Sequence, residues 1–243
     1  MEIKICAIAD IHGSLIDIPE CDILCICGDI LPLHIQRKEF TSIAWLSGPF
    51  QKWCLEAPCD HVIMIWGNHD FIGEKLYNKP RYMQEGWEQE ELLFQNDDKH
   101  KIHILQDESV VINNIKFYGT PWCPALTSWA FYGNSDELKN KFENIPYDTN
   151  VLLTHCPPKF GQQGIVLQPN NWNYLSNFGC EELQEAIEKK FALKSTTTHI
   201  FSGHIHSGNH NEEVSGGLVY RNVSIKDENY DITYSPKITT IYV

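Results

Sequence analysis

Carboxylate, amide and imidazole side chains recur along this chain in short polar segments. In order these segments are Asp10-x-His12, Gly28-Asp29, Gly67-Asn68-His69-Asp70, Thr154-His155 and Gly203-His204-x-His206. Oxygen and imidazole ligands of this kind suit borderline divalent metals such as manganese, iron, zinc, cobalt or nickel. The candidate ligands are Asp10, His12, Asp29, Asn68, His155, His204 and His206. This set is too large for one tetrahedral ion but suits two ions that share a carboxylate. Two such ions can together bind a phosphoryl group and activate a water molecule.

Each candidate also has an ordinary structural role, which a single occurrence would favour. Asp10 or Asp29 alone could cap a helix or form a turn, and Asn68 could form an Asx-turn. His155 alone is more often a hydrogen-bonded structural histidine than a ligand. The repetition of the pattern is what indicates a metal site. The remaining histidines fit no pattern and are expected to be structural or solvent-facing: His34, His61, His100, His103, His199 and His210.

The elements that must position these residues are short buried strands followed by loops. Apolar, β-branched runs end in the polar segments at 3–10, 21–29, 61–70, 151–158 and 198–204. In sheets with helical crossovers, ligands bind where the carboxyl ends of the strands gather polar loops. The pattern therefore predicts an α/β protein with its site at such an edge.

The rest of the chain alternates between helical and extended patterns. Helices are expected at 38–58 with an interruption near Gly48-Pro49, at 88–96, at 135–142 with Ser135 as N-cap, and at 181–194. Further strands are expected at 101–105, 109–112, 116–120, 217–225 and 237–243, with a hairpin turn at Asn113-Asn114. The stretch 164–180 shows no clear periodicity and predicts a long loop. Since no repeat or linker is present, residues 1–243 are interpreted as a single domain.

Composition limits the function classes that this chain can serve. The chain has 19 Lys and Arg residues and 32 Asp and Glu residues, so its net charge is −13. This negative charge disfavours an extended nucleic-acid partner. A small phosphoester substrate can still bind if metal cations reverse the local field. The nine cysteines lack a disulfide spacing, and no signal peptide or membrane-length apolar run is evident. We therefore expect a reduced, soluble, cytoplasmic protein with no membrane partner.

The ordered motifs DxH, GD, GNH[DE], H and GHxH resemble those of the calcineurin-like metallophosphoesterase superfamily, over residues 6–206. The segments YGTPWCP (118–124) and LLTHCPP (152–158) resemble the metallophosphoesterase-domain-containing subfamily, which is related to class III cyclic-nucleotide phosphodiesterases. In that subfamily a glycine often follows the middle histidine, where this chain has Cys156. Some animal members have lost a histidine of the last motif, whereas this chain keeps both His204 and His206.

The resemblance implies a fold and a role for each site residue. The implied fold is a four-layer α/β/β/α sandwich of two mixed β-sheets flanked by helices. Asp10, His12 and His206 would hold the first ion, Asn68, His155 and His204 the second, and Asp29 would bridge them. His69 would stabilise the phosphate and protonate, or hydrogen-bond to, the departing oxygen, while Asp70 would orient His69 and stabilise its charge. Gly28, Gly67 and Gly203 would let the backbone turn beside the ions.

The implied function is hydrolysis of phosphodiesters or phosphomonoesters by a metal-bridging hydroxide, with manganese as the expected metal in vitro. Protein phosphatases of the superfamily carry an arginine shortly after GD, but here the sequence continues GDILPLH and Arg37 lies outside the motif. Nucleases of the superfamily usually add a DNA-binding region. Small phosphodiesters such as cyclic nucleotides are therefore the leading substrate class. The alternative functions are those of a protein phosphatase, a nuclease or a weakly active nucleotide-binding regulatory protein.

Loop aromatics offer a wall for a nucleobase. The candidates are Trp122, Trp129, Phe160 and Trp172, at least two of which are expected to pack against the core instead. The sequence makes no prediction of oligomeric state.

Overall fold

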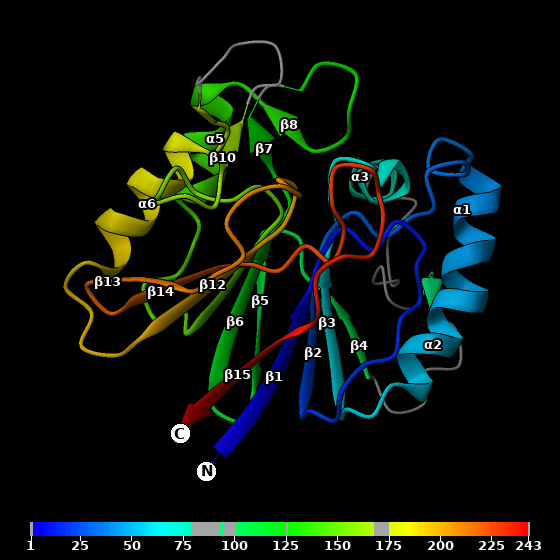
Figure 1. Cartoon of the computed structure of the whole chain (residues 1–243), viewed down its shortest axis with the longest axis horizontal. Coiled ribbons are helices and arrows are strands. Elements are labelled where there is room, and N and C mark those ends of the chain that lie inside the picture. The colour runs from blue at the N-terminus through cyan, green and yellow to red at the C-terminus, as the bar shows by residue number, and fades with distance from the viewer. Residues whose placement is uncertain (1, 79–92, 95–100, 125, 168–174, 243) are drawn as a thin grey trace.

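Two large mixed sheets dominate the computed structural model, which describes residues 2–78, 93–94, 101–124, 126–167 and 175–242 (Figure 1). The first sheet has the strand order β15-β1-β2-β3-β4, with only β15 antiparallel to its neighbour. Its strands are β1 (Glu2–Ile8), β2 (Ile23–Cys27), β3 (His61–Ile65), β4 (Ile102–Ile104) and β15 (Lys237–Tyr242). Strand β2 is buried throughout, which explains its continuously apolar sequence.

The second sheet has the order β13-β14-β12-β9-β6-β5, with its two outer pairs antiparallel and its inner pairs parallel. Its strands are β5 (Glu108–Ile112), β6 (Ile115–Thr120), β9 (Val151–Thr154), β12 (Thr198–Ser202), β13 (Glu213–Ser215) and β14 (Leu218–Asn222). Asn113 and Asn114 turn the β5–β6 hairpin with φ of 52° and 62°, as expected.

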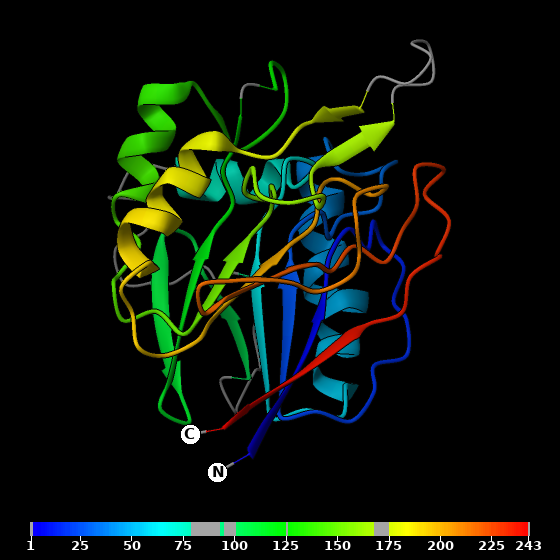
Figure 2. The same cartoon turned by 60° about the vertical axis from the view of Figure 1, so that its left-hand side comes forward.

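Helices cover the outer face of each sheet (Figures 1 and 2). On the first sheet lie α1 (Glu39–Trp45), the π-helical turn η1 (Leu46–Phe50), α2 (Gln51–Glu56) and α3 (Phe71–Tyr77). On the second lie α5 (Ser135–Phe142) and α6 (Glu181–Phe191). Apolar side chains fill the space between each sheet and its helices, and a further apolar cluster fills the space between the two sheets. In this central cluster Ile5 and Ile63 of the first sheet face Phe117, Val151 and Phe201 of the second. The predicted four-layer α/β/β/α sandwich is confirmed.

Local differences from the sequence predictions have physical causes. Helix 38–58 is interrupted as predicted, because Pro49 lies inside the π-helical turn. Ser135 as the N-cap of α5 is wrong by one residue. Asn134 caps this helix, with its side chain accepting from Glu137 N–H at 3.1 Å while the Glu137 carboxylate accepts from Asn134 N–H at 2.8 Å.

The prediction of a long loop at 164–180 is wrong for the described part of this segment. This segment contains an antiparallel pair, β10 (Ile165–Leu167) and β11 (Leu175–Asn177), whose three-residue strands are too short to show periodicity. A small parallel pair, β7 (Cys123–Pro124) and β8 (Tyr132–Gly133), lies near α5. Most of the helix expected at 88–96 lies outside the described residues. Within the described part of the chain, no helix has both the length and the apolarity to cross a membrane. The single domain 1–243 stays a prediction.

Candidate metal centre

The seven predicted ligands lie on loops that directly follow five strands. Asp10 and His12 follow β1, Asp29 follows β2, and Asn68 follows β3, all from the first sheet. His155 follows β9, and His204 and His206 follow β12, from the second sheet. The site is therefore assembled where the carboxyl ends of strands from both sheets meet.

Overlapping groups of ligand atoms connect these residues. The ligand atoms of Asp10, His12 and His206 lie within 4.8 Å of one another, as do those of Asp10, Asp29 and His155. His155 Nε2 lies 2.9 Å from Asn68 Oδ1, and its ring contacts the His204 ring edge-on at a centroid distance of 5.1 Å. The structure thus brings the two predicted ligand sets into one cluster.

Asp29 occupies the middle of this cluster. Its Oδ1 lies 3.3 Å from His155 Nε2, and its Oδ2 lies 3.7 Å from His12 Nε2. The two oxygens of one buried carboxylate therefore face one member of each predicted set. This position is what a carboxylate shared by two cations requires.

Backbone carbonyls orient two of the imidazoles. His155 Nδ1 donates to the carbonyl of Cys27 and His206 Nδ1 donates to the carbonyl of Asp227, both at 2.9 Å. Each bond leaves Nε2 directed at the carboxylates, as in many metal-binding histidines. His210 belongs to none of the groups of possible ligand atoms among the described residues; its Nε2 donates to the His206 carbonyl at 2.8 Å and its ring stacks on Tyr234.

The chemistry of the donors fits a cation. Both ring nitrogens of His12 are buried without a hydrogen-bond partner among the described residues, a state that is costly unless another group binds there. Burial lowers the pKa of His12 to about 4 against the raising effect of Asp29, and burial likewise lowers the pKa of His204 to about 4. Both imidazoles are therefore neutral at pH 7 and carry a free lone pair for a metal.

The backbone is strained at four of the seven ligands. Asp10, His12, Asp29 and His204 have φ of 55°, 42°, 54° and 67°, a left-handed region that residues with a Cβ rarely adopt. Such strain concentrates at functional sites. Gly28 turns with φ of 88°, as expected. Gly67 and Gly203 instead allow close approach, because a Cβ there would overlap Asp29 Oδ1 or Asp10 Oδ2.

Asp70 does not orient His69, and that part of the predicted site is wrong. The Asp70 carboxylate accepts backbone N–H groups from Ile30 and Leu31 at 3.0 Å and from Gly67 at 2.8 Å. Asp70 thus ties the loop of Asp29 to the loop of Asn68. The partner of His69 Nδ1 is instead the side-chain oxygen of Gln36, which no sequence pattern singled out.

A cavity of about 370 Å³ opens onto the centre, within the size range of small-molecule sites. Its polar lining includes Asp29, Asn68, His69, His204 and His206, and its apolar lining includes Leu126, Trp129, Val166, Ile205 and Tyr230. Sequence reasoning missed Tyr230, whose ring edge contacts His12 and His206. It lies in a loop without any motif, so no sequence signal marked it.

Of the four aromatics proposed as a base-binding wall, Trp129 lies at the cavity, with its ring 4.3 Å from that of His69. Trp122 donates its Nε1–H to Asp107 at 2.8 Å, and Phe160 stacks on Tyr220 at 4.3 Å. These two are partly buried and pack against the apolar core clusters, as expected for at least two of the set. Trp172 lies outside the described residues.

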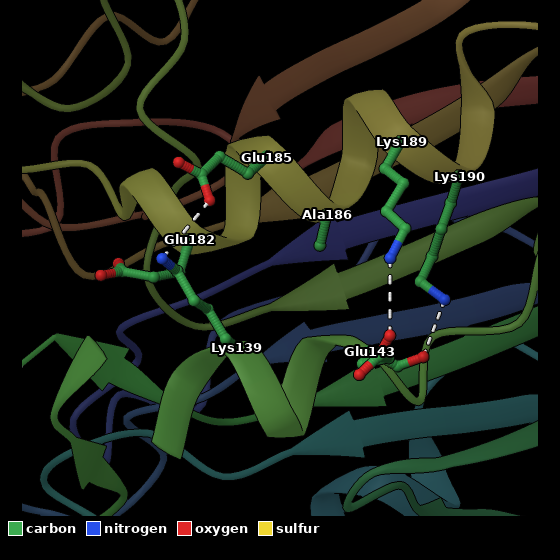
Figure 3. A pocket seen from close by; sticks show the side chains of 7 residues that line it. All are labelled: Lys139, Glu143, Glu182, Glu185, Ala186, Lys189 and Lys190. Carbon is green, nitrogen blue, oxygen red and sulfur yellow. Dashed lines mark hydrogen bonds and ion pairs between the residues drawn. The ribbon is translucent and has the colours of Figure 1, made fainter. Parts of the chain in front are cut away.

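A second cavity, of about 270 Å³, lies between α5 and α6 (Figure 3). Its charged side chains pair with one another: Lys189 with Glu143 at 3.4 Å and Lys139 with Glu185 at 3.9 Å. Lys190 Nζ donates to the Glu143 carbonyl at 2.7 Å. Because these charges satisfy one another, this groove is a weaker candidate than the cavity at the strand ends.

A two-sheet sandwich with oxygen and imidazole ligands at the shared strand edge defines a metal-binding α/β protein. More particularly, the chain belongs to the calcineurin-like phosphoesterase family, whose sequence profile matches residues 3–208. This is a family of metal-dependent hydrolases of phosphoesters. The resemblance drawn from the motifs is thereby confirmed.

Curated relatives agree with this membership. The chain is 28% identical over 250 residues to UPF0046 protein T07D4.2 of Caenorhabditis elegans, covering 96% of this chain and 58% of that protein. It is 28% identical over 227 residues to metallophosphoesterase domain-containing protein 1 of Homo sapiens, covering 86% of this chain and 63% of that protein. The chain thus spans less than two thirds of the length of either relative.

Among solved structures, phosphopantetheinyl hydrolase (PptH) from Mycobacterium tuberculosis resembles this chain at a TM-score of 0.48 and 13% identity. The match covers 93% of this chain and 90% of that one.

Metal binding is expected to release protons, because His155 is charged in the metal-free protein. Burial lowers the pKa of His155, but the facing Asp29 carboxylate outweighs it and raises this pKa to about 10. A metal ion must displace that proton, so zinc affinity should rise at least about tenfold per pH unit from about pH 7 to 9. Competition with a chelator at each pH measures this change in affinity, and an affinity independent of pH would contradict the charged pair of His155 and Asp29.

The contribution of charged His155 to the stability of the metal-free protein should change with pH in the opposite direction. It is fully present below the unfolded pKa of about 6.5 and is lost as the pH rises towards 10.

Proposed function

We propose that this protein hydrolyses small phosphodiesters, with cyclic nucleotides as the leading substrates, at two divalent metal ions that share Asp29. The single observation that carries the proposal is the convergence of six other predicted ligand side chains around the buried Asp29 carboxylate below an open cavity. Asp10, His12 and His206 would hold one ion, and Asn68, His155 and His204 the other. When bound, the ions would supply Lewis-acid charge and an acidified water as nucleophile.

The chain's own residues would orient the ester and manage its protons. His69 reaches the cavity from the loop after β3, with Nε2 lying 3.8 Å from Asp29 Oδ2 and Nδ1 held by Gln36. This position supports a role for His69 in stabilising the phosphate and assisting the departing oxygen. The Asp70 carboxylate would act only by holding the ligand loops together.

Small esters are favoured over phosphoproteins by the cavity itself. Its described lining contains no lysine or arginine, so the phosphate charge must be met by cations and His69. Arg37 lies behind the cavity wall, since it donates to the Ser128 carbonyl at 2.9 Å and its guanidinium lies over the rings of Phe71 at 4.0 Å and Trp129 at 5.3 Å. With a net charge of −13, the chain also offers little attraction to extended nucleic acid.

Trp129 supports a nucleobase as the substrate's apolar part, because it is the aromatic side chain beside His69 at the cavity. Base stacking on an aromatic ring contributes about 1–3 kcal/mol. In Trp129→Ala we expect the KM for a cyclic nucleotide to rise about 5- to 100-fold, while the KM for a dialkyl phosphodiester stays within about twofold. Trp129→Phe, which keeps an aromatic face, is the matched control. An equal loss with both substrates would argue against base stacking.

The function is tested with a panel of phosphoesters in added manganese. The panel contains 3′,5′- and 2′,3′-cyclic nucleotides, bis(p-nitrophenyl) phosphate and phosphomonoesters. Turnover of diesters above monoesters supports the proposal. A well-folded protein with two bound ions and no turnover of any ester would instead favour a nucleotide-binding regulatory protein.

A further inference from the structure

A buried cysteine, Cys123, lies against the metal centre although it belongs to none of the five ligand motifs. Cys123 belongs to β7, and its Sγ, one ring nitrogen of His155 and one ring nitrogen of His204 all lie within 4.8 Å of one another. Its side chain is completely buried. The backbone holds it there, because Cys123 N–H donates to the Phe131 carbonyl at 2.8 Å and β7 pairs in parallel with β8.

From this juxtaposition we propose that Cys123 is a thiolate ligand of the ion held by Asn68, His155 and His204, and that it makes this position selective for a thiophilic metal such as zinc. The proposal rests on the proposed two-metal centre and specifies which metal one of its positions takes. Sulfur ligands favour zinc over manganese, which prefers oxygen ligands. The two positions would therefore differ, since Asp10, His12 and His206 offer only oxygen and nitrogen.

Cys123 is distinguished from its cysteine neighbours by what it faces. Cys156 and Cys180 are equally buried in the same apolar cluster, but neither belongs to a group of potential ligand atoms in the described part of the chain. Cys156 Sγ instead lies 3.5 Å from the Pro157 carbonyl and 3.8 Å from that of Phe178. Cys123 Sγ makes weak contacts with the Cys156 thiol and, at 3.8 Å, with the Pro121 carbonyl, which a bond to a metal ion could replace.

The position of Cys123 also suits a shared coordination sphere. His155 Nδ1 is occupied by the Cys27 carbonyl, so Nε2 is the nitrogen left to bind a metal ion. The His204 ring meets the His155 ring edge-on at a centroid distance of 5.1 Å, so the two imidazoles can approach one ion from different sides. Zinc–sulfur bonds of about 2.3 Å and zinc–nitrogen bonds of about 2.0–2.1 Å require only small side-chain adjustments within such a group.

Cobalt substitution tests the proposal without any activity measurement. Protein loaded with two equivalents of Co²⁺ is expected to show an intense near-ultraviolet sulfur-to-cobalt charge-transfer band. In Cys123→Ser this band should be lost, whereas the matched control Cys156→Ser should keep it, because a serine there still has two carbonyl acceptors. A band that persists in Cys123→Ser, or two bound cobalt ions without any band in the wild type, would overturn the thiolate ligand.

Zinc K-edge absorption of the wild-type protein gives a readout that needs no variant. We expect one sulfur per two zinc ions at about 2.3 Å. A competition between zinc and manganese should show at least a tenfold preference for zinc at one position, reduced in Cys123→Ser. Only oxygen and nitrogen neighbours around zinc would overturn the proposal and leave the proposed phosphoesterase function standing. Failure to bind any cobalt or zinc would overturn both.

Discussion

Asp29→Ala is expected to remove most bound metal and to reduce turnover of any phosphoester at least about 10³-fold. The reason is the position of this carboxylate, which faces His155 with Oδ1 and His12 with Oδ2. Its loss therefore weakens both predicted ion positions together. Loss of one preorganised donor to the developing charge already costs about 10²–10³ in rate, so loss of cations that stabilise the whole phosphoryl group must cost more.

Metal content by elemental analysis and initial rates on bis(p-nitrophenyl) phosphate measure this effect. Asp107→Ala is the matched control, because Asp107 is also a largely buried carboxylate but accepts from Thr120 and Trp122 away from the cavity. The control should lose stability while keeping its metal content. If Asp29→Ala kept two ions or measurable turnover, Asp29 would not be the shared ligand.

The clustering of the candidate ligands could be predicted from sequence because each lies a few residues after an apolar strand. Five such strands, three in the first sheet and two in the second, are parallel to one another within each sheet and have their carboxyl ends at one edge of the sandwich. The local sequence patterns therefore indicated which residues would meet in the folded protein. The sandwich layers were implied by the family resemblance, because the local patterns alone indicated only alternating strands and helices. In the structure the helices α5 and α6 bury Leu138, Leu183 and Ile187 against the second sheet.

Contacts between loops could not be predicted in this way. Gln36 reaches His69 from 33 residues earlier, and no pattern marks it. Asp70 follows His69 directly, which suggested a carboxylate–imidazole pair, yet its oxygens accept the N–H groups of Ile30, Leu31 and Gly67. The loops that contain Ile30, Leu31 and Gly67 have backbone N–H groups without a partner in regular secondary structure, and these groups need acceptors once they are buried. The cost of leaving them unpaired decides the role of Asp70.

His69→Ala is expected to leave the metal content unchanged and to lower kcat about 10²–10⁴-fold, the usual contribution of a positioned acid or base. The loss should depend on the leaving group. A p-nitrophenolate departs without much proton assistance, whereas the alkoxide of a cyclic nucleotide needs it. The rate should therefore fall much more for the cyclic nucleotide than for bis(p-nitrophenyl) phosphate. Equal loss of metal and activity would make His69 a ligand instead.

The pH dependence of His69 provides the sharpest form of this test. Burial lowers the pKa of His69, against the raising effect of Asp29. A histidine that must be protonated to assist the leaving group works below its pKa, so the wild-type rate should fall on the alkaline side and His69→Ala should lack this fall. Gln36→Glu places a carboxylate on Nδ1 and should move the alkaline fall upward by about 1–3 pH units. Gln36→Leu keeps the packing without the charge and should show no upward shift. If the decrease in rate at alkaline pH were the same in the wild type, Gln36→Glu and His69→Ala, His69 would be excluded as the proton donor.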